Sequence, residues 1–480
     1  MSDLAPWSVD AMAAAMGAAR SGPLPDIVSG LSIDSRSVAP GEAFFAIQGD
    51  ARDGHEFVPG ALTAGAALSV VSEAKRSAMP PGAPLLVVAD VLQGLTDLAR
   101  AARARSRAKI IAVTGSVGKT GTKEALRLAL AQSGATHASV ASYNNHWGVP
   151  LSLARMPANT AFAVFEIGMN HAGEITPLTR LVRPQVAIVT TIEPVHLEYF
   201  GTLEAIADAK AEIFLGLEPG GAAVLNRDNA QYDRLRGAAE QCGARTVSFG
   251  QHAQADARLI NVSLQPESSA VHATILGNEV TYKLGSPGHH VVLNSLAVLA
   301  AATLAGTDLA LTALALAGFE PPTGRGQRIA LELPGGGEAL LIDESYNANP
   351  ASMRAALAVL GQAGIGRNGR RIAVLGDMLE LGPAGAELHG GLINAVLRHD
   401  VDLVFCSGPL MRSLWDALPS ERRGGYAESA AALEPQVLGA VQEGDAVMVK
   451  GSLGSKMGPI VKALTRHYRR RMPEEASARG

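Results

Sequence analysis

The chain has 480 residues, more than one hydrophobic core usually serves, so two or three domains are expected. Its 47% hydrophobic content predicts a well-buried globular protein, and its net charge of −4 argues against a nucleic-acid binder, which usually carries a basic face. The N-terminus lacks a secretion-signal pattern, and no apolar run reaches the roughly 18 residues of a membrane span. A soluble, cytoplasmic protein is therefore expected.

The first segment extends to about residue 108 and ends in an Arg-rich stretch, residues 100–107. Such a stretch is either a nucleic-acid patch or the solvated face of a helix before a domain joint. The acidic net charge favours the helix face.

The second segment begins with an apolar, β-branched run at residues 110–113. Further runs typical of strands follow at residues 162–165, 186–191 and 222–225, with helical stretches between them. This alternation predicts a parallel sheet covered by helices on both faces. The Gly- and Pro-rich passage at residues 318–326 indicates the next joint.

The third segment repeats the αβ pattern on a smaller scale, which predicts a second doubly wound sheet. Its expected strands are residues 339–342, 372–375, 403–405 and 446–449. Residues 469–480 are charged and poor in apolar side chains, so we expect a disordered tail. The predicted domains are residues 1–108, 109–324 and 325–470, followed by the tail at 471–480.

The two cysteines, Cys242 and Cys406, lie far apart inside apolar stretches. This position favours two buried thiols over a disulfide or a metal-binding pair. Free thiols agree with a reducing cytoplasm.

A phosphate-binding loop follows the first strand of the second segment. Residues 110–114 are expected to form the strand, residues 115–120 a tight turn and residues 123–132 a helix. Glycines in such a turn let backbone N–H groups point at an anion, and the helix N-terminus adds partial positive charge. Lys119 can then reach the β- and γ-phosphates, and the Thr120 hydroxyl can bind Mg²⁺. Val113 occupies the first glycine position of the usual eight-residue pattern, so this is a shorter form of the loop.

Polar side chains stand after the other expected strands, at the sheet edge where ligands bind in open α/β sheets. Glu166 is a plausible Mg²⁺ ligand or a solvated acid at a strand end, and these readings are balanced. His196 is favoured as a ligand by its place beside the other candidates. Lys210 lies in an Ala-rich helix, where the residues alone indicate a surface lysine.

Together, the loop and the Glu166, His196 and Lys210 segments resemble the ATP-dependent Mur ligases, which extend the UDP-N-acetylmuramoyl peptide of peptidoglycan. The resemblance covers nearly the whole chain. Residues 33–38 and 53–55 are similar to the family's UDP-sugar-binding N-terminal domain. The resemblance implies an α/β fold of three domains: a UDP-binding α/β domain, a central P-loop ATPase domain with a parallel sheet, and a C-terminal Rossmann-like domain.

Three further segments, residues 142–150, 342–350 and 375–382, resemble the branch of the family that adds D-alanyl-D-alanine to the tripeptide. The Asp-Asn-Pro-Arg motif of the branch that adds the third amino acid is absent. The expected reaction passes through an acyl phosphate and yields the pentapeptide, ADP and phosphate.

The resemblance also assigns roles to residues. Expected ATP contacts are Thr114, Gly115, Ser116, Val117, Gly118, Lys119, Thr120, His290, Asn294, Arg325 and Asp343. Expected Mg²⁺ ligands are Thr120, Glu166, His196 and Lys210, with Lys210 carbamylated and Lys119, His196 and Lys210 catalytic. Ser35, Arg36 and Asn144 are expected to bind the UDP substrate. Asn347 and Asn349 are candidates for D-alanyl-D-alanine contact, with a turn role before Pro350 equally open.

Two positions depart from the pattern of relatives. Val291 replaces a common Asn near the nucleotide, and Leu453 stands where many relatives have Arg, so the segment from Lys450 to Ser452 receives no role. We expect a monomer that acts on ATP, the UDP-tripeptide and the dipeptide, without nucleic acid. The alternatives are a sister ligase, either the diaminopimelate- or lysine-adding or a folylpolyglutamate-type enzyme, and a non-ligating P-loop switch.

Overall fold

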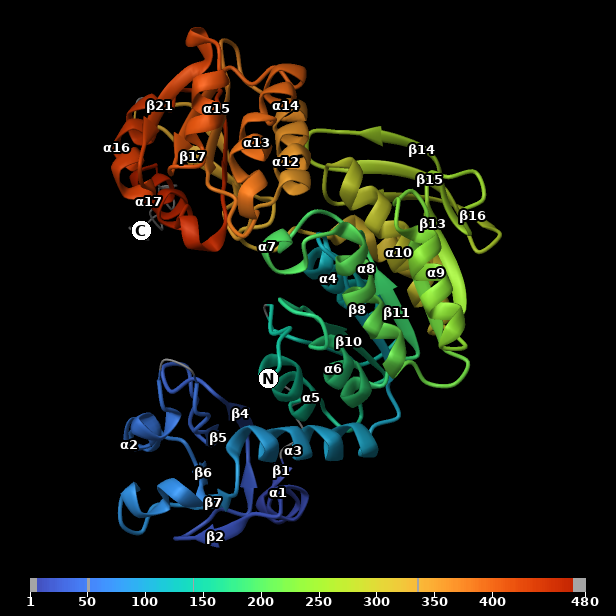
Figure 1. Cartoon of the computed structure of the whole chain (residues 1–480), viewed down its shortest axis with the longest axis vertical. Coiled ribbons are helices and arrows are strands. Elements are labelled where there is room, and N and C mark those ends of the chain that lie inside the picture. The colour runs from blue at the N-terminus through green and yellow to red at the C-terminus, as the bar shows by residue number, and fades with distance from the viewer. Residues whose placement is uncertain (1–6, 50–51, 141, 335, 469–480) are drawn as a thin grey trace, which may run out of the picture.

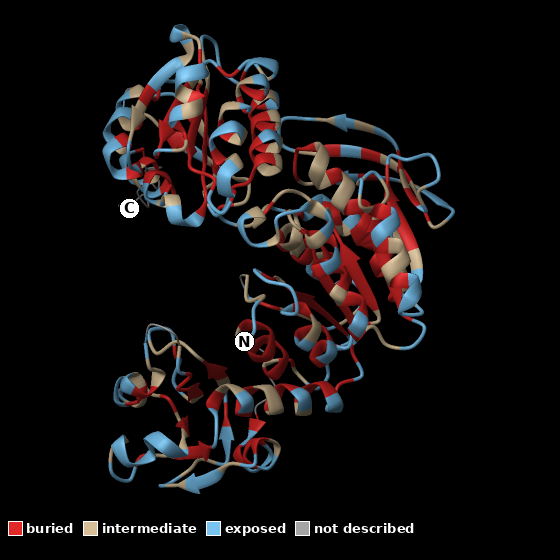
Figure 2. Ribbon diagram, in the orientation of Figure 1, coloured by how far each residue is buried: buried red, intermediate tan, exposed pale blue. Residues whose placement is uncertain are grey.

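The computed structural model describes residues 7–49, 52–140, 142–334 and 336–468, which form three α/β units in chain order (Figure 1). Each unit has its own main sheet, and Figure 2 shows the inner strands of these sheets coloured as buried. The α/β architecture predicted from the sequence is confirmed. No helix in the described ranges is long and apolar enough to cross a membrane. The expected disordered tail lies outside the described residues.

The N-terminal unit is built on a five-stranded sheet of order β2-β7-β6-β5-β4, in which only β2 is antiparallel to its neighbour. Its strands are β2 (Ala19–Ser21), β4 (Gly30–Ser32), β5 (Glu42–Phe45), β6 (Leu68–Ser72) and β7 (Leu85–Val88). A separate pair joins β1 (Trp7–Ser8) to β3 (Ile27–Val28). The helices are α1 (Val9–Met16), α2 (Val58–Thr63) and α3 (Val91–Arg105).

The central unit has a nine-stranded sheet of order β16-β15-β14-β13-β12-β11-β8-β10-β9. Its strands are β8 (Lys109–Thr114), β9 (Thr136–Ala138), β10 (Phe162–Glu166), β11 (Val186–Val189), β12 (Ala222–Asn226), β13 (Arg245–Gly250), β14 (Ala257–Leu264), β15 (Ser269–Ile275) and β16 (Asn278–Leu284). Strands β8 to β14 run parallel to one another in the sheet. Beyond them, β14, β15 and β16 pair antiparallel, an extension that was not predicted from the sequence.

Both faces of the inner parallel strands of the central sheet are buried, as predicted. Along β8, Ile110 and Ala112 belong to one apolar cluster while Ile111 and Val113 belong to another, because successive side chains of a strand point to opposite faces. The helices of this unit are α4 (Lys119–Leu130), α5 (Gly148–Ala154), α6 (Ile175–Val182), α7 (Leu197–Phe200), α8 (Leu203–Ala211), α9 (Tyr232–Gln241), α10 (His289–Leu304) and α11 (Leu309–Ala315).

The C-terminal unit has a six-stranded sheet of order β17-β18-β22-β19-β20-β21, parallel except for β17. Its strands are β17 (Gln327–Glu332), β18 (Glu338–Glu344), β19 (Arg371–Gly376), β20 (Leu403–Ser407), β21 (Arg423–Ala427) and β22 (Ala446–Lys450). Its helices are α12 (Pro350–Gln362), α13 (Gly385–Gly390), α14 (Ile393–Arg398), α15 (Arg412–Ala417), α16 (Ala430–Ala440) and α17 (Gly458–His467). Every strand expected from the sequence is present.

The N-terminal and central units share one apolar cluster, which runs from Trp7 to Ala239. The indole Nε1 of Trp7 donates to Ala154 O over 2.9 Å, and Arg155 Nε donates to Leu31 O over 2.8 Å. In Figure 1, α3 lies across this boundary beside α5. The two units are therefore packed together rather than only linked.

Three local predictions are wrong in detail. The helix after the phosphate loop begins at Lys119 rather than residue 123, because the loop leads directly into its first turn. The Arg-rich stretch is not simply a solvated face: Arg103 is buried and Nε donates to Val182 O over 2.8 Å, while Arg105 lies over the Trp7 ring. Cys406 is buried as expected, but Cys242 is exposed where α9 ends; both thiols are free.

Candidate nucleotide and metal site

The turn between β8 and α4 has the backbone of an anion-binding loop. Gly115 and Gly118 adopt φ angles of 145° and 89°, which L side chains rarely adopt. A β-carbon at Gly115 would lie 1.9 Å from Thr190 Oγ1, and one at Gly118 would lie 2.5 Å from Asn294 Nδ2. Glycine is therefore required at both positions by the conformation, and at Gly115 also by the space. The loop presents the N-terminus of α4, where N–H groups and partial positive charge attract phosphate.

Lys119 adds a full charge to this loop. Its ammonium donates to Gly115 O over 2.7 Å. Burial lowers the pKa of Lys119, the Glu166 carboxylate raises it, and the Arg325 guanidinium lowers it again. These opposing effects place a carboxylate and a second cation close to the ammonium, in keeping with a site for a highly charged anion and a metal ion.

Glu166 ends β10 directly beside the loop and is only 1% exposed. Its Oε2 accepts a hydrogen bond from Thr120 Oγ1 over 2.8 Å, and its Oε1 accepts one from Asn144 Nδ2 over 2.7 Å. The solvated-acid reading of Glu166 is therefore wrong. The parallel strands β8 and β10 bring Thr120 and Glu166 together because their carboxyl ends share one edge of the sheet.

His196 immediately precedes α7 and Lys210 lies near the end of α8. Lys210 is 2% exposed, so the surface reading of this lysine is also wrong. Burial and the charge of Lys119 hold the pKa of Lys210 well below its usual range. Burial also lowers the pKa of His196, which Glu380 raises and Lys210 and Lys119 lower further. These effects place His196 near Glu380 and the two lysines.

The oxygen donors here fit a hard cation. Thr120 and Glu166 are hydrogen-bonded to each other, buried, and close to the positive charge of Lys119. In the described part of the chain, no group of three or more His, Cys, Asp or Glu side chains is placed to hold a metal. A complete ligand set therefore needs donors of other kinds, such as the Thr120 hydroxyl or a modified Lys210.

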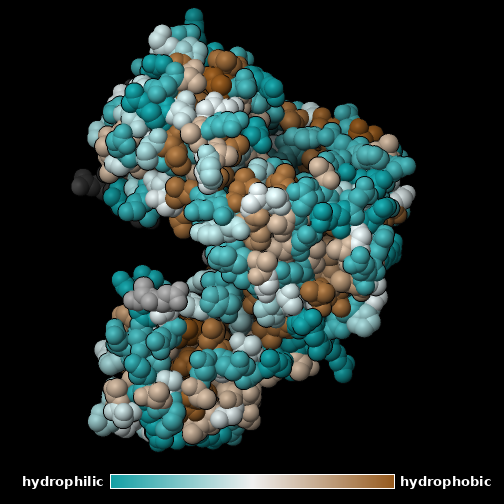
Figure 3. Space-filling view, viewed as in Figure 1, coloured by the Kyte–Doolittle hydropathy of each residue, from teal (hydrophilic) through white to brown (hydrophobic). Residues whose placement is uncertain are grey.

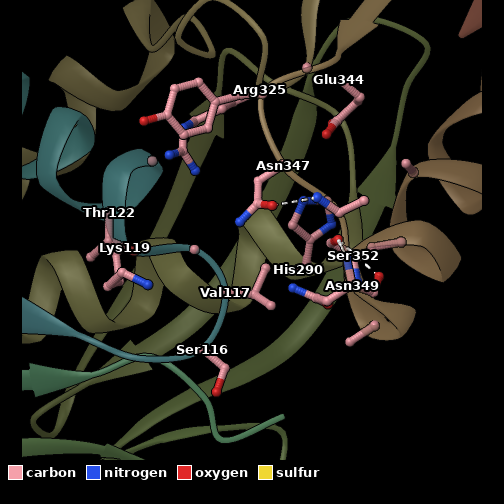
Figure 4. Close-up of a pocket in the computed structure, with 18 of the residues that line it drawn as sticks. Ser116, Val117, Lys119, Thr122, His290, Arg325, Glu344, Asn347, Asn349 and Ser352 are labelled. Atoms are coloured by element: carbon pink, nitrogen blue, oxygen red, sulfur yellow. Dashed lines mark hydrogen bonds between the residues drawn. The ribbon is translucent and has the colours of Figure 1, made fainter. Parts of the chain in front are cut away.

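One cavity of about 810 Å³ lies between the central and C-terminal units, and neither Thr120 nor Lys210 lines it. Lys119, Glu166 and His196 line it from the central unit, and Arg325, Asn347 and Asn349 line it from the C-terminal unit. Figure 4 shows Lys119, Val117 and Ser116 along the loop, with Asn347, Asn349 and His290 facing them. Arg325 Nη2 donates to Ser142 Oγ over 3.1 Å, and its guanidinium lies 4.1 Å from the centre of the Tyr346 ring.

The remaining C-terminal candidates have local partners. Asn349 Oδ1 accepts from Ser352 N over 2.9 Å in a capping box that begins α12, so the turn role of Asn349 is confirmed. Asn347 Oδ1 accepts from Ala348 N over 2.9 Å. The Asp343 carboxylate accepts from Ser345 N over 3.0 Å, and Asp343 does not line the cavity. Both asparagines, in contrast, do line it.

Family models match three consecutive parts of the chain. The Mur ligase family catalytic domain matches residues 27–105, the Mur ligase middle domain residues 113–302, and the Mur ligase glutamate ligase domain residues 324–453. A UDP-N-acetylmuramoyl-tripeptide–D-alanyl-D-alanine ligase of Rickettsia prowazekii (strain Madrid E) is 32% identical over 90% of this chain and 94% of its own. The ligase of the same name from Bacillus subtilis (strain 168) is 33% identical over 91% and 93%.

The chain belongs to the Mur ligase family.

Solved structures give the same answer. MurF from Acinetobacter baumannii superposes with a TM-score of 0.83 at 29% identity, covering 97% of this chain and all of that one. The MurF ligase of Thermotoga maritima, in complex with ADP, superposes with a TM-score of 0.75 at 25% identity, covering 92% and 98%. The three-domain α/β architecture expected for a Mur ligase is therefore confirmed.

The candidates for the UDP substrate are not gathered in this Mur ligase. Asn144 lies beside Glu166, but Ser35 and Arg36 belong to the N-terminal unit and do not line the cavity. Arg36 makes a two-point contact with Asp34, through Nε at 2.9 Å and Nη2 at 2.7 Å. Figure 3 shows a deep hollow between this unit and the C-terminal unit.

Sequence reasoning missed three polar groups of the Mur ligase cavity. Glu193 lines it, and burial raises the pKa of this carboxyl. Ser142 contacts both Arg325 and, over 3.3 Å, Thr120 Oγ1. Glu380 lies 2.5 Å from His196. Ser142 and Glu380 stand inside segments that the sequence singled out, whereas only the position of Glu193 after a strand marked it.

Proposed function

We propose that this Mur ligase joins D-alanyl-D-alanine to UDP-N-acetylmuramoyl-tripeptide, with ATP converted to ADP and phosphate, to give the pentapeptide of peptidoglycan synthesis. The observation that carries the proposal is the single cavity in which the phosphate loop faces Arg325 and the Asn347 turn. The names of its relatives, over nine-tenths of the chain, support the choice of substrates.

The reaction requires activation because a carboxylate oxygen is a poor leaving group. The terminal carboxylate of the tripeptide attacks the γ-phosphoryl group of ATP, giving an acyl phosphate and ADP. The free amine of the dipeptide then attacks the acyl carbon, and phosphate leaves from the tetrahedral intermediate. Positioning and charge neutralisation dominate phosphoryl transfer, which is the role of Lys119 and Arg325 on either side of the cavity.

Mg²⁺ would be held by Thr120, Glu166, His196 and Lys210, where it neutralises phosphate charge. The fit rests on the buried Thr120–Glu166 pair. The other loop residues, from Thr114 to Gly118, are proposed to hold the phosphates, and His290 and Asn294 are proposed to contact the nucleotide. Asp343 is proposed for the ribose when the C-terminal unit closes further.

Lys210 supports the metal site only after modification. In the described ranges its ammonium has no hydrogen bond or ion pair, and an unpaired charge in this buried position is unfavourable. The neutral amine is therefore the favoured form, and it is the form that adds carbon dioxide with loss of one proton to give a carbamate. The carbamate replaces a repelled cation with an anionic oxygen ligand.

The remaining assignments concern substrates and organisation. Ser35, Arg36 and Asn144 are proposed to hold the UDP substrate, and Asn347 and Asn349 to border the dipeptide. We further propose domains at residues 1–108, 109–324 and 325–470 and a monomer in the cytoplasm. The Asn349 amide nitrogen is the group proposed for a dipeptide contact, because its oxygen already caps α12.

The function is tested with purified protein, ATP and UDP-N-acetylmuramoyl-tripeptide. ADP release should depend on D-alanyl-D-alanine and form pentapeptide, detected by mass spectrometry. Single amino acids, including lysine, diaminopimelate and glutamate, serve as matched amines. ADP release that is equal with a single amino acid, or equal without any amine, contradicts the proposal and favours a sister ligase or a nucleotide switch.

A further inference from the structure

We propose that Glu380 of the C-terminal unit is a positioning residue for His196 of the central unit, so that docking of the C-terminal unit completes the metal site. This inference rests on the proposed function, because it presupposes that His196 binds a metal ion. Glu380 belongs to the segment at residues 375–382, to which the reaction described above gives no task.

The contact joins side chains 184 residues apart in the sequence. His196 Nδ1 lies 2.5 Å from Glu380 Oε2, and the two side chains are 24% and 45% exposed. Within the described residues, no other hydrogen bond reaches the His196 ring. Figure 1 shows α7, which begins directly after His196, on the side of the central unit that faces the C-terminal unit.

The backbone on both sides of the contact is unusual. His196 has φ 54° and Glu380 has φ 63°, which is the left-handed region that non-glycine residues seldom occupy. Such conformations persist where the surrounding structure holds them, and they concentrate at functional sites. Glu198 N donates to Glu380 O over 3.4 Å, so the two segments also meet through their backbones.

The His196 imidazole has two ring nitrogens, one for Glu380 and one for the proposed metal ion. When Nδ1–H donates to the Glu380 carboxylate, the tautomer is fixed and Nε2 keeps its lone pair for a metal ion. A carboxylate in this place also increases the basicity of the ring. Within the described residues, the Glu380 carboxylate is the one group that hydrogen-bonds the His196 ring. Glu380 therefore supplies the hydrogen-bond acceptor for Nδ1–H of this histidine.

The alternative is an ion pair that only holds two domains together. Exposed pairs of this kind contribute little, and their removal leaves the chemistry of the central unit unchanged. A positioning role predicts that loss of Glu380 weakens metal binding, which depends on the orientation and basicity of His196. A purely structural ion pair predicts unchanged metal binding.

The test measures Mn²⁺ binding by electron paramagnetic resonance on the full chain at saturating ADP. We compare wild type, Glu380→Gln, Glu380→Ala and Glu198→Gln. Gln keeps an acceptor oxygen without the charge, and Ala removes both. Glu198 is a matched control, exposed and two residues from His196. Mn²⁺ affinity should fall about tenfold in Glu380→Gln and towards a hundredfold in Glu380→Ala. Glu198→Gln should bind like wild type.

The outcomes separate the inference from the function on which it rests. If wild type binds no Mn²⁺ with ADP, the proposed metal site itself is wrong. If wild type binds and both Glu380 variants bind equally well, the positioning role is overturned. An equal loss in Glu198→Gln also overturns it, because the effect would then be one of general charge. Unchanged melting temperatures show that the variants are folded.

Discussion

The cavity between the central and C-terminal units and the Ser35–Arg36 segment of the N-terminal unit are the two regions proposed to hold substrates. In the cavity, side chains from distant segments already contact one another, as Arg325 does Ser142 and Glu380 does His196. In the N-terminal segment, the Arg36 side chain makes its hydrogen bonds, among the described residues, to Asp34, two residues away. The proposed ATP side is therefore built from contacts between two units, whereas the proposed UDP side rests on a contact within one short segment.

The largest expected effect comes from a substitution in the cavity between the central and C-terminal units. Lys119→Ala removes the loop's only lysine, and ATP turnover should fall by about a thousandfold or more, in the range known for cations that stabilise phosphoryl transfer. ADP release measures it. The exposed Lys283→Ala in β16 is the control and should stay at wild-type activity. Near-normal turnover in Lys119→Ala would remove the phosphate-loop interpretation.

A second variant tests Lys210, the buried lysine of the proposed metal site. Lys210→Ala should reduce activity by about a hundredfold, because the site loses a ligand. Short carboxylic acids such as acetate should restore part of the activity by supplying the missing oxygen. Full activity in Lys210→Ala without any added acid would refute the carbamate.

The N-terminal segment should respond differently. Arg36→Ala should raise the KM for the UDP-tripeptide by about tenfold, the scale of one charged hydrogen bond, with the KM for ATP unchanged. Steady-state kinetics with each substrate varied in turn measures the KM for the UDP-tripeptide and the KM for ATP separately. Arg20→Ala, which removes another exposed arginine paired with an aspartate, is the control. A rise of the KM for ATP alone would contradict the separation of the two regions.

The smallest effect concerns the stability of the N-terminal unit. Burial alone would raise the pKa of Asp53, but hydrogen bonds from His55 and Lys75 bring it to about 2, below the usual 3.8. A lowered pKa means stability that is present above pH 3.8 and lost as the pH falls towards 2. Asp53→Asn should lower the free energy of unfolding by about 1 kcal/mol at pH 7.

The difference between wild type and Asp53→Asn should shrink through that pH window, as followed by urea unfolding. Asp10→Asn, at an exposed ion pair of the same unit, is the control. A difference that is independent of pH would show that charge is not the cause.

Local patterns in the sequence were sufficient for the fold and part of the site. Alternating apolar runs located the strands. The rule that ligands bind at the carboxyl ends of strands located Glu166. Both predictions depend only on neighbouring strands within one sheet. The contacts of Arg325 and Glu380 depend on how two units dock, which no local pattern encodes. The burial of Arg103 was missed for a similar reason: its acceptors include the backbone carbonyls of Val182 and Arg183, which side-chain patterns do not reveal.

The apolar cluster that runs from Trp7 to Ala239 has a consequence for how this chain can be divided. Cutting it after residue 108 would strip α3 from α5 and uncover side chains such as Leu151 and Leu153, which are fully buried. An isolated central fragment would present that face to water and aggregate. The sequence is modular in its motifs, but the first two units should unfold as one cooperative body, and the C-terminal unit, with its own two cores, separately.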